Sequence, residues 1–183
     1  MKKQKLRLST KEWTLEEYEK IQQFREKSLD QSQPYGNIDA WENILQVCGM
    51  TTKEFDAMTP AEFLELTKKV SFEGVGKHQR EIVVNEIKFS AFEKGEKFRV
   101  GIREAGAIER ITKAKNGITY AEILACLLLR ENETRETKLT TENINEKALI
   151  LRDIKAVVAI PFLSSWLEAC MLVLDSQKDE TTE

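Results

Sequence analysis

The stretch Thr51–Thr67, TTKEFDAMTPAEFLELT, is the most informative about the fold, because it contains two helix starts in close succession. In both TTKE and TPAE a threonine stands three residues ahead of a glutamate. Each side chain can bond the backbone N–H of the other residue, which satisfies two donors at a helix end. Pro60 follows Thr59 at the first helical position, where its missing N–H costs nothing. The stretch therefore predicts two short helices, the second reaching Lys69 or Val70.

Similar signals occur on both sides of this stretch. The Thr-x-x-Glu pattern recurs at Thr14 and Thr119, and Asn37 offers a further helix cap. Apolar residues follow each cap at helical spacing, and Gly49 stands where the helix after Asn37 should stop. Pro161 is expected at the first position of the last helix. Including the C-terminal half, the sequence predicts further helices over residues 15–27, 38–48, 104–113, 120–130, 141–154 and 161–174.

The middle of the chain differs, because Ile82–Phe89 is rich in β-branched residues and Phe98, Val100 and Ile102 alternate with other residues. This pattern predicts a β-hairpin that turns at Lys94–Glu96 and packs on helices or pairs with another chain. We expect an α+β fold that is predominantly α-helical, with short amphipathic helices and a small β-hairpin in the middle. The expected organisation is a basic N-terminal tail (1–12), an N-terminal helical lobe (13–72), a hairpin plus C-terminal helical lobe (73–174) and an acidic tail (175–183).

The composition is that of a globular protein in a reducing environment. The 183 residues are 41% hydrophobic and 32% charged, which excludes an intrinsically disordered chain. Three cysteines without a CxxC spacing argue against a disulfide framework and against zinc. No apolar segment follows the basic start, so no secretory signal is expected. Ala156–Leu174 is apolar but contains Glu168, and we expect a buried core helix there instead of a membrane span. The chain is therefore expected to be cytoplasmic.

The sequence offers little for catalysis. His78 is the only histidine, which excludes most histidine-based triads and metal sites. No nucleophile-plus-base arrangement, calcium loop or zinc motif occurs. We therefore predict no catalytic, cofactor-binding or metal-binding residues and a protein that is not an enzyme. An enzyme that uses carboxylates alone remains an alternative, because such a pair can assemble from distant residues.

A DNA-binding regulator is a second alternative. Residues 103–115 carry four basic side chains ahead of a turn at Asn116–Gly117 and a helix, as in a helix-turn-helix. Two observations disfavour this reading. The helix that would read the DNA is strongly apolar, and the net charge of the chain is −3. Nucleic acid is therefore not the expected partner.

Large aromatic side chains are the best candidates for contacts with another protein, because aromatic residues often anchor such interfaces. A protein of short amphipathic helices can also offer a groove to an apolar helix of a partner. The predicted partner-binding residues are Trp41, Phe63, Phe162 and Trp166. A protein partner is expected, a homo-oligomer remains open, and a membrane is not expected.

Four segments together resemble the tail assembly chaperones of tailed bacteriophages, the small proteins that accompany the tape-measure protein. They are WTLEEYEKI (Trp13–Ile21), IDAWENILQVCGMTTKEFDAMTPAEFLELTKKVSF (Ile38–Phe72), ITYAEILACLLL (Ile118–Leu129) and IPFLSSWLEAC (Ile160–Cys170). The resemblance covers most of residues 13–174 and is one of element order, so it assigns no individual binding residue.

The resemblance implies a non-catalytic protein of the infected bacterium's cytoplasm. Such a protein shields apolar helices of a tape-measure protein and recruits tail-tube subunits. It implies either a chaperone or a virion-assembly adaptor. A structural virion component of similar layout remains an alternative, and so does a longer product made by frameshifting.

Overall fold

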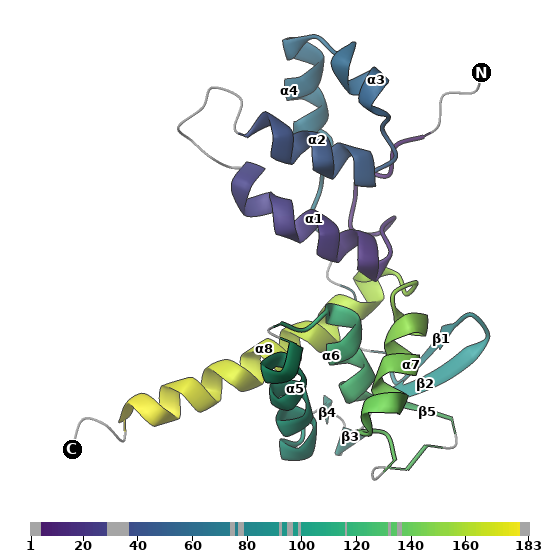
Figure 1. The fold of residues 1–183 in the computed structure, drawn as a ribbon, viewed down its shortest axis with the longest axis vertical. Helices are drawn as coiled ribbons and strands as arrows, with labels where there is room; N and C mark the ends of the chain where they lie inside the picture. The colour runs from purple at the N-terminus through teal and green to yellow at the C-terminus, as the bar shows by residue number, and fades with distance from the viewer. Residues whose placement is uncertain are drawn as a thin grey trace. The chain divides into compact units, whose positions relative to one another are not determined.

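The computed structural model describes residues 5–28, 37–73, 76, 79–91, 93–94, 97–98, 100–115, 117–131, 133–134 and 137–179 (Figure 1). The helices are α1 (Leu15–Ser28), α2 (Ile38–Val47), α3 (Thr52–Asp56), α4 (Pro60–Lys69), α5 (Ile102–Lys115), α6 (Tyr120–Leu127), α7 (Thr141–Leu151) and α8 (Ala156–Asp179). The strands are β1 (Glu81–Val84), β2 (Ile87–Ala91), β3 (Glu93–Lys94), β4 (Lys97–Phe98) and β5 (Leu128–Arg130). The predicted α+β class with mostly helical content is confirmed.

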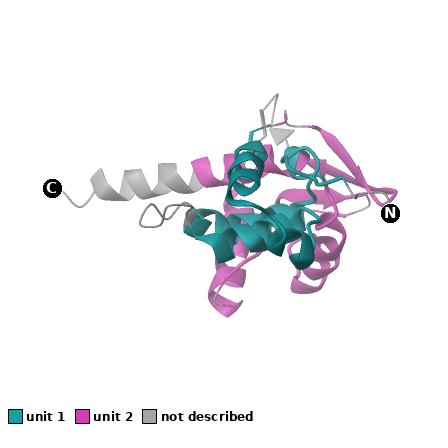
Figure 2. Cartoon of the chain, turned by 90° about the horizontal axis from the view of Figure 1, so that it is seen from above, with its two compact units in different colours: residues 1–74, 155–157 teal, residues 75–154, 158–183 magenta. Residues whose placement is uncertain are grey.

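The chain forms two compact units (Figure 2). Unit 1 comprises residues 1–74 and 155–157, and unit 2 comprises residues 75–154 and 158–183. Unit 1 contains α1 to α4, whereas unit 2 contains the strands, α5 to α7 and most of α8.

The predicted helix caps at Thr14, Asn37, Thr51, Thr59 and Thr119 are confirmed. The threonine and the glutamate bond each other's backbone N–H at the starts of α1, α3, α4 and α6. The Asn37 side chain accepts a bond from Ala40 at the start of α2. That helix ends at Val47 with Cys48 as its C-cap, and Gly49 follows as predicted with a φ of 103°. Met50 N–H bonds Leu45 O and Gly49 N–H bonds Gln46 O, the bonds of a glycine-terminated helix.

The core of unit 1 lies between α1 and α2. The fully buried side chains there include Trp13, Leu15, Ile21, Ile44, Leu45 and Cys48. Residues 5–12, which the sequence analysis places in the basic tail, are hydrogen bonded to this unit. Arg7 N–H bonds Cys48 O at 3.0 Å, and Ser71 N–H bonds Leu8 O at 2.8 Å. The described part of that segment is therefore an integral part of unit 1.

Unit 2 contains an antiparallel sheet in the order β1-β2-β5. The main hairpin turns at Asn85–Glu86, where both residues have positive φ angles of 49° and 66°. Two such residues form a turn that matches the twist of paired strands, and asparagine tolerates that conformation well. The predicted turn at Lys94–Glu96 joins only the two-residue strands β3 and β4, and residues 95 and 96 lie outside the described ranges. The sequence analysis therefore placed the main hairpin too far along the chain.

Other predicted boundaries are also wrong, among them the starts of α5 and α8 and the ends of α6, α7 and α8. Ile102, expected in a strand, is the first residue of α5. The helix predicted to reach Arg130 ends at Leu127, because Leu128–Arg130 pairs with β2 instead. The last helix starts at Ala156, so Pro161 lies inside it and not at its first position. At that point the proline removes one backbone hydrogen bond near the start of a long helix.

Candidate functional site

The candidate site lies on α3, α4 and the start of α2, all within unit 1. Helix α3 has only five residues and buries none of its own side chains. Phe55 therefore packs on its neighbour, and its ring meets that of Phe63 edge to face, at 6.1 Å between centroids and 90° between planes. Aromatic pairs favour this geometry because the edge of one ring is attracted to the face of the other.

A small apolar cavity opens beside these rings, with a volume of about 180 Å³. Ile38 stands at one side of it and is 45% exposed. The cavity is smaller than typical small-molecule sites of roughly 300–1,000 Å³. Its size suits one apolar side chain of another molecule. The lining residues are Ile38, Phe55, Met58, Thr59, Pro60 and Phe63.

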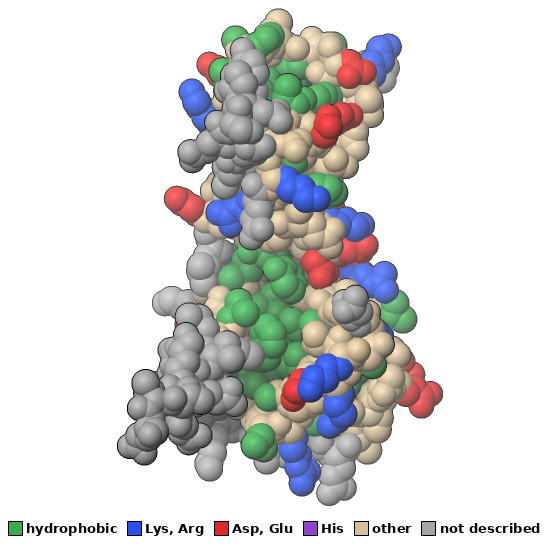
Figure 3. All heavy atoms as spheres, turned by 60° about the vertical axis from the view of Figure 1, so that its left-hand side comes forward, with side chains coloured by type: hydrophobic (Ala, Val, Ile, Leu, Met, Phe, Trp, Pro, Cys, Tyr) green, Lys and Arg blue, Asp and Glu red, His purple; other side chains and the backbone are tan. Residues whose placement is uncertain are grey.

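An open groove of about 490 Å³ adjoins this cavity, and Met58 contributes to both. The groove is lined by Glu54, Ala57, Met58, Glu62, Glu65, Leu66 and Lys69. We refer to the cavity and the groove together as the α3–α4 groove. The lining of the open groove is mixed: Ala57, Met58 and Leu66 are apolar, whereas Glu54, Glu62, Glu65 and Lys69 are charged. In Figure 3, apolar side chains are exposed at the end of unit 1 and acidic side chains lie beside them.

Two of the rim carboxylates are held in place by the caps that start the helices. Oε2 of Glu54 accepts a hydrogen bond from the Thr51 hydroxyl at 2.8 Å, and Oε2 of Glu62 accepts one from the Thr59 hydroxyl at 2.7 Å. The third, Glu65, is exposed and lies 4.0 Å from Lys69 Nζ. The caps that define the two helices thus also fix negative charge at the rim.

The structure brings only one of the four predicted partner-binding residues to this groove. Phe63 forms part of its wall and is 8% exposed. Trp41 is partly buried on α2, where its Nε1–H donates a hydrogen bond to the carbonyl of Ser28 at 3.1 Å. Phe162 is fully buried on α8, and Trp166 is partly buried one turn later. Both of these belong to unit 2.

Sequence reasoning missed Ile38, Phe55 and Met58. The packing of Phe55 could have been predicted from the sequence, because an aromatic residue on a helix of one turn must pack on a neighbouring element. Ile38 belongs to the predicted apolar stripe of α2, and its exposure follows from its place at the first turn of that helix. Met58 lies in the connection between α3 and α4, where no periodic pattern indicates which side chains are buried.

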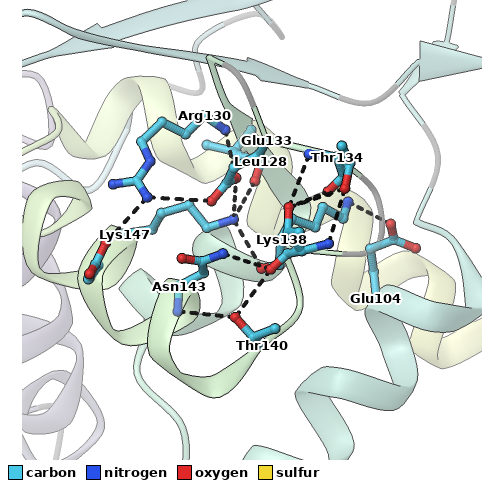
Figure 4. A network of polar contacts seen from close by, with 11 residues as sticks. Glu104, Leu128, Arg130, Glu133, Thr134, Lys138, Thr140, Asn143 and Lys147 are labelled. Carbon is cyan, nitrogen blue, oxygen red and sulfur yellow. Dashed lines mark hydrogen bonds and ion pairs between the residues drawn. The ribbon is translucent and has the colours of Figure 1, made fainter.

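Unit 2 contains a different feature, a buried network of charged side chains (Figure 4). Lys147 of α7 has no exposed surface, and its ammonium group bonds the carbonyls of Leu128 and Lys138 at 3.1 and 3.3 Å. It also bonds Oε2 of Glu133 at 2.9 Å. The guanidinium of Arg130 lies 3.8 Å from the other oxygen of Glu133. These contacts join β5, the connection that follows it and α7.

A second lysine in this network is also completely buried. Lys138 Nζ lies 2.6 Å from Oε1 of Glu104, and both side chains are shielded from water. Lys138 lies in the connection between β5 and α7. Charged residues are rarely buried without a partner, and here each ammonium group meets a carboxylate. The network therefore ties α5 to the segment before α7.

Burial is the largest cause of the pKa shifts of Lys147 and Cys126. It lowers the pKa of Lys147, although the bond and the charge of Glu133 oppose this shift. Burial also raises the pKa of the Cys126 thiol to about 12. A thiol in that state is protonated at neutral pH and a poor nucleophile. Since Lys147 has no exposed surface, the network's evident effect is structural.

The arrangement of α5 and α6 bears on the helix-turn-helix alternative. Every residue from Ala121 to Leu127 is buried within unit 2. A recognition helix must present one face to the DNA major groove, and α6 has no such face. Lys115, one of the basic residues before it, forms an ion pair with Glu122. Asn116, part of the predicted turn, lies outside the described ranges.

Within the described ranges, no cluster of three His, Cys, Asp or Glu side chains could hold a metal ion. His78 lies outside those ranges. In the same part of the chain, no helix is both long and apolar enough to cross a membrane. The first half of α8 is largely buried as expected, and Leu167 is exposed.

Comparisons of the chain with models of known protein families, with curated proteins and with solved structures found no match.

Proposed function

We propose that this chain is a non-catalytic protein-binding protein and that the α3–α4 groove receives an apolar helix of its partner. The observation that carries the proposal is an apolar cavity the size of one side chain, beside an open groove that shares Met58 with it. Amphipathic helices bind such grooves by inserting side chains from one face. Burial of the exposed part of Ile38 and of the partner's side chains would supply the driving force, about 25 cal/mol per Å² before the costs of association.

The proposed biological role is that of a phage tail assembly chaperone or adaptor, which acts in the cytoplasm of the infected host. The sequence resemblance over residues 13–174 supports this role. A tape-measure protein has long apolar helices that need shielding before assembly, and the α3–α4 groove is suited to one face of such a helix. A structural virion component could use the same groove, but it would remain bound in the finished particle.

The test is co-expression with the longest helical protein encoded beside its gene, followed by purification at moderate and high salt. Ile38→Ser removes the exposed apolar side chain of the groove. Leu149→Ser makes the same change at a side chain of unit 2 that is 59% exposed, and serves as the matched control. We expect the partner to co-purify with the wild type and the control, and to be lost with Ile38→Ser.

Two results would contradict the proposal. Recovery of nucleic acid that dissociates as salt is raised would favour the regulator, because phosphate contacts weaken steeply with ionic strength. Recovery of the partner with Ile38→Ser as efficiently as with the wild type would show that binding occurs elsewhere on the chain.

A further inference from the structure

We propose that Leu128–Arg130 is a conformational switch segment, which forms strand β5 while the buried ammonium group of Lys147 holds it and extends helix α6 when that hold is lost. The switch segment lies entirely within unit 2 and is independent of the proposed binding function. Three features of the molecule support it: the backbone at Leu128, the composition of the segment and the hydrogen bonds of Lys147.

The backbone leaves the helical conformation at Leu128. The N–H of this residue still bonds the carbonyl of Leu124, as in the helix before it, but its φ of −105° and ψ of 145° are those of an extended residue. A helical ψ at Leu128 would continue α6 into the residues that now form β5. The change from strand to helix therefore begins with one rotation, at Leu128.

The composition of the switch segment favours a helix. Leucine and arginine are among the strongest helix formers, whereas strands are enriched in β-branched and aromatic residues. The sequence pattern accordingly predicts a helix that reaches Arg130, but the structure has a strand over Leu128–Arg130. Local preference and tertiary contacts are thus opposed in this segment. We expect such a segment to change its conformation when the contacts that hold it are removed.

Those contacts are centred on Lys147 (Figure 4). Its side chain has no exposed surface, and its ammonium group donates to the carbonyls of Leu128 and Lys138 at 3.1 and 3.3 Å. The third donor bonds Oε2 of Glu133 at 2.9 Å, so all three donors of the ammonium group are used. The same Glu133 oxygen accepts a bond from the Arg130 N–H at 2.9 Å. Lys147 therefore holds one end of the switch segment directly and the other end through Glu133.

These bonds fit only the extended form of the switch segment. In a continued helix the Leu128 carbonyl would point along the helix axis, toward the residue four positions later, and away from Lys147. The Arg130 N–H would turn to the carbonyl of Cys126 and leave Glu133. Because a buried ammonium group that loses its acceptors is costly, Lys147 favours the strand. Removal of this side chain lifts that preference.

Strand β2 reports which form the switch segment takes. The N–H of Ala91 bonds the carbonyl of Arg80, so residues of β2 that bond β1 alternate with residues that face β5. Ser90, opposite Leu129, is on the β5 side, whereas Phe89 is on the β1 side. Exchange of the Ser90 amide therefore reports on β5, and exchange of the Phe89 amide is the internal control.

The test compares the wild type with Lys147→Met/Glu133→Leu, which removes both partners of the buried ion pair. Lys113→Met makes the same lysine change at a side chain of α5 that is 75% exposed, and serves as the matched control. Amide exchange and Cα chemical shifts of the full chain are measured by NMR. We expect the Ser90 amide to exchange at least about tenfold faster in the double variant and the Phe89 amide to change less than about twofold. The Cα shifts of Leu128–Arg130 should move from strand to helix values, and Lys113→Met should change neither readout.

A second variant, Lys147→Met/Glu133→Gln, keeps a side-chain oxygen for the Arg130 N–H, and we expect the same changes in it. The proposal is overturned if the folded variants keep strand values at Leu128–Arg130 or wild-type protection at Ser90. It is also overturned if β5 leaves β2 and the segment becomes irregular, because Lys147 would then only attach a strand. Failure of both variants to fold would contradict it as well, since the network would then hold all of unit 2 and not this segment.

Discussion

Both units expose large apolar side chains, but among the described residues the fully buried charged side chains all lie in unit 2. Unit 1 leaves Ile38 exposed at the edge of an apolar cavity, whereas unit 2 completely buries the charged side chains of Lys138 and Lys147. Exposed apolar surface costs stability that a partner can recover. Buried ion pairs are costly to form and even more costly to break. The apolar cavity makes unit 1 the proposed binding surface, whereas the buried network ties elements of unit 2 together.

The largest expected effect is in the buried network. Lys147→Met leaves the carboxylate of Glu133 buried without its main partner, and removing one member of a buried pair typically costs about 3–5 kcal/mol. We expect a loss of this size in the free energy of unfolding, measured by urea denaturation followed by circular dichroism. The double variant Lys147→Met/Glu133→Leu should recover much of it. A loss below about 1 kcal/mol would mean that the network does not stabilise unit 2.

A smaller effect is expected at the cap that builds the groove. Thr59→Ala removes the hydroxyl that bonds the backbone of Glu62, and loss of an N-cap typically costs about 1 kcal/mol. Thr59→Ser keeps the hydroxyl and serves as the conservative control. Hydrogen exchange of the α4 amides should be faster in the alanine variant alone. Equal exchange in both variants would show that packing of Phe63, not the cap, holds α4 in place.

The loss of folding stability at acid pH should depend on Glu122. Burial alone would raise its pKa, but hydrogen bonds from Lys115 and Thr119 bring the pKa below its ordinary value of 4.5. A carboxylate with a lowered folded-state pKa contributes stability above pH 4.5 that is lost as the pH falls through the folded-state value. Glu122→Gln should therefore flatten the decline of stability below pH 4.5. An unchanged acid profile would place the sensitive group elsewhere.

The smallest effect on stability is expected at Ile38. Ile38→Ser should change the free energy of unfolding by less than about 0.5 kcal/mol, because surface substitutions outside special features rarely do more. The same variant should abolish partner binding. Thermal denaturation of the two serine variants, Ile38→Ser and Leu149→Ser, would check this. A large loss of stability at Ile38 alone would make the residue part of the core and remove the groove's exposed anchor.

The sequence predicted the features that depend on local chemistry. Helix starts were predicted at Thr14, Asn37, Thr51, Thr59 and Thr119 because a cap is a contact between residues three positions apart. The end of α2 ahead of Gly49 was predictable for the same reason. These caps also determine much of the candidate site, since they place Glu54 and Glu62 at its rim.

Features that depend on distant residues were not predicted. Leu128–Arg130 reads as a continuation of a helix, and only its pairing with β2 makes it a strand. Burial of Lys138 requires Glu104, far away in the sequence, and no periodic pattern indicates such a pair. The main hairpin was misplaced because Asn85–Glu86 lacks the glycine that usually marks a two-residue turn. The cavity was missed because Ile38 and Phe63 meet only in the folded unit.

The most direct test of the central claim, that unit 1 carries the binding surface, is hydrogen–deuterium exchange of the full chain with and without its co-expressed partner. We predict added protection at the start of α2 and in α3 and α4, with little change in α6 and α7. Protection confined to unit 2, or none in α3 and α4 when the partner is bound, would contradict the account.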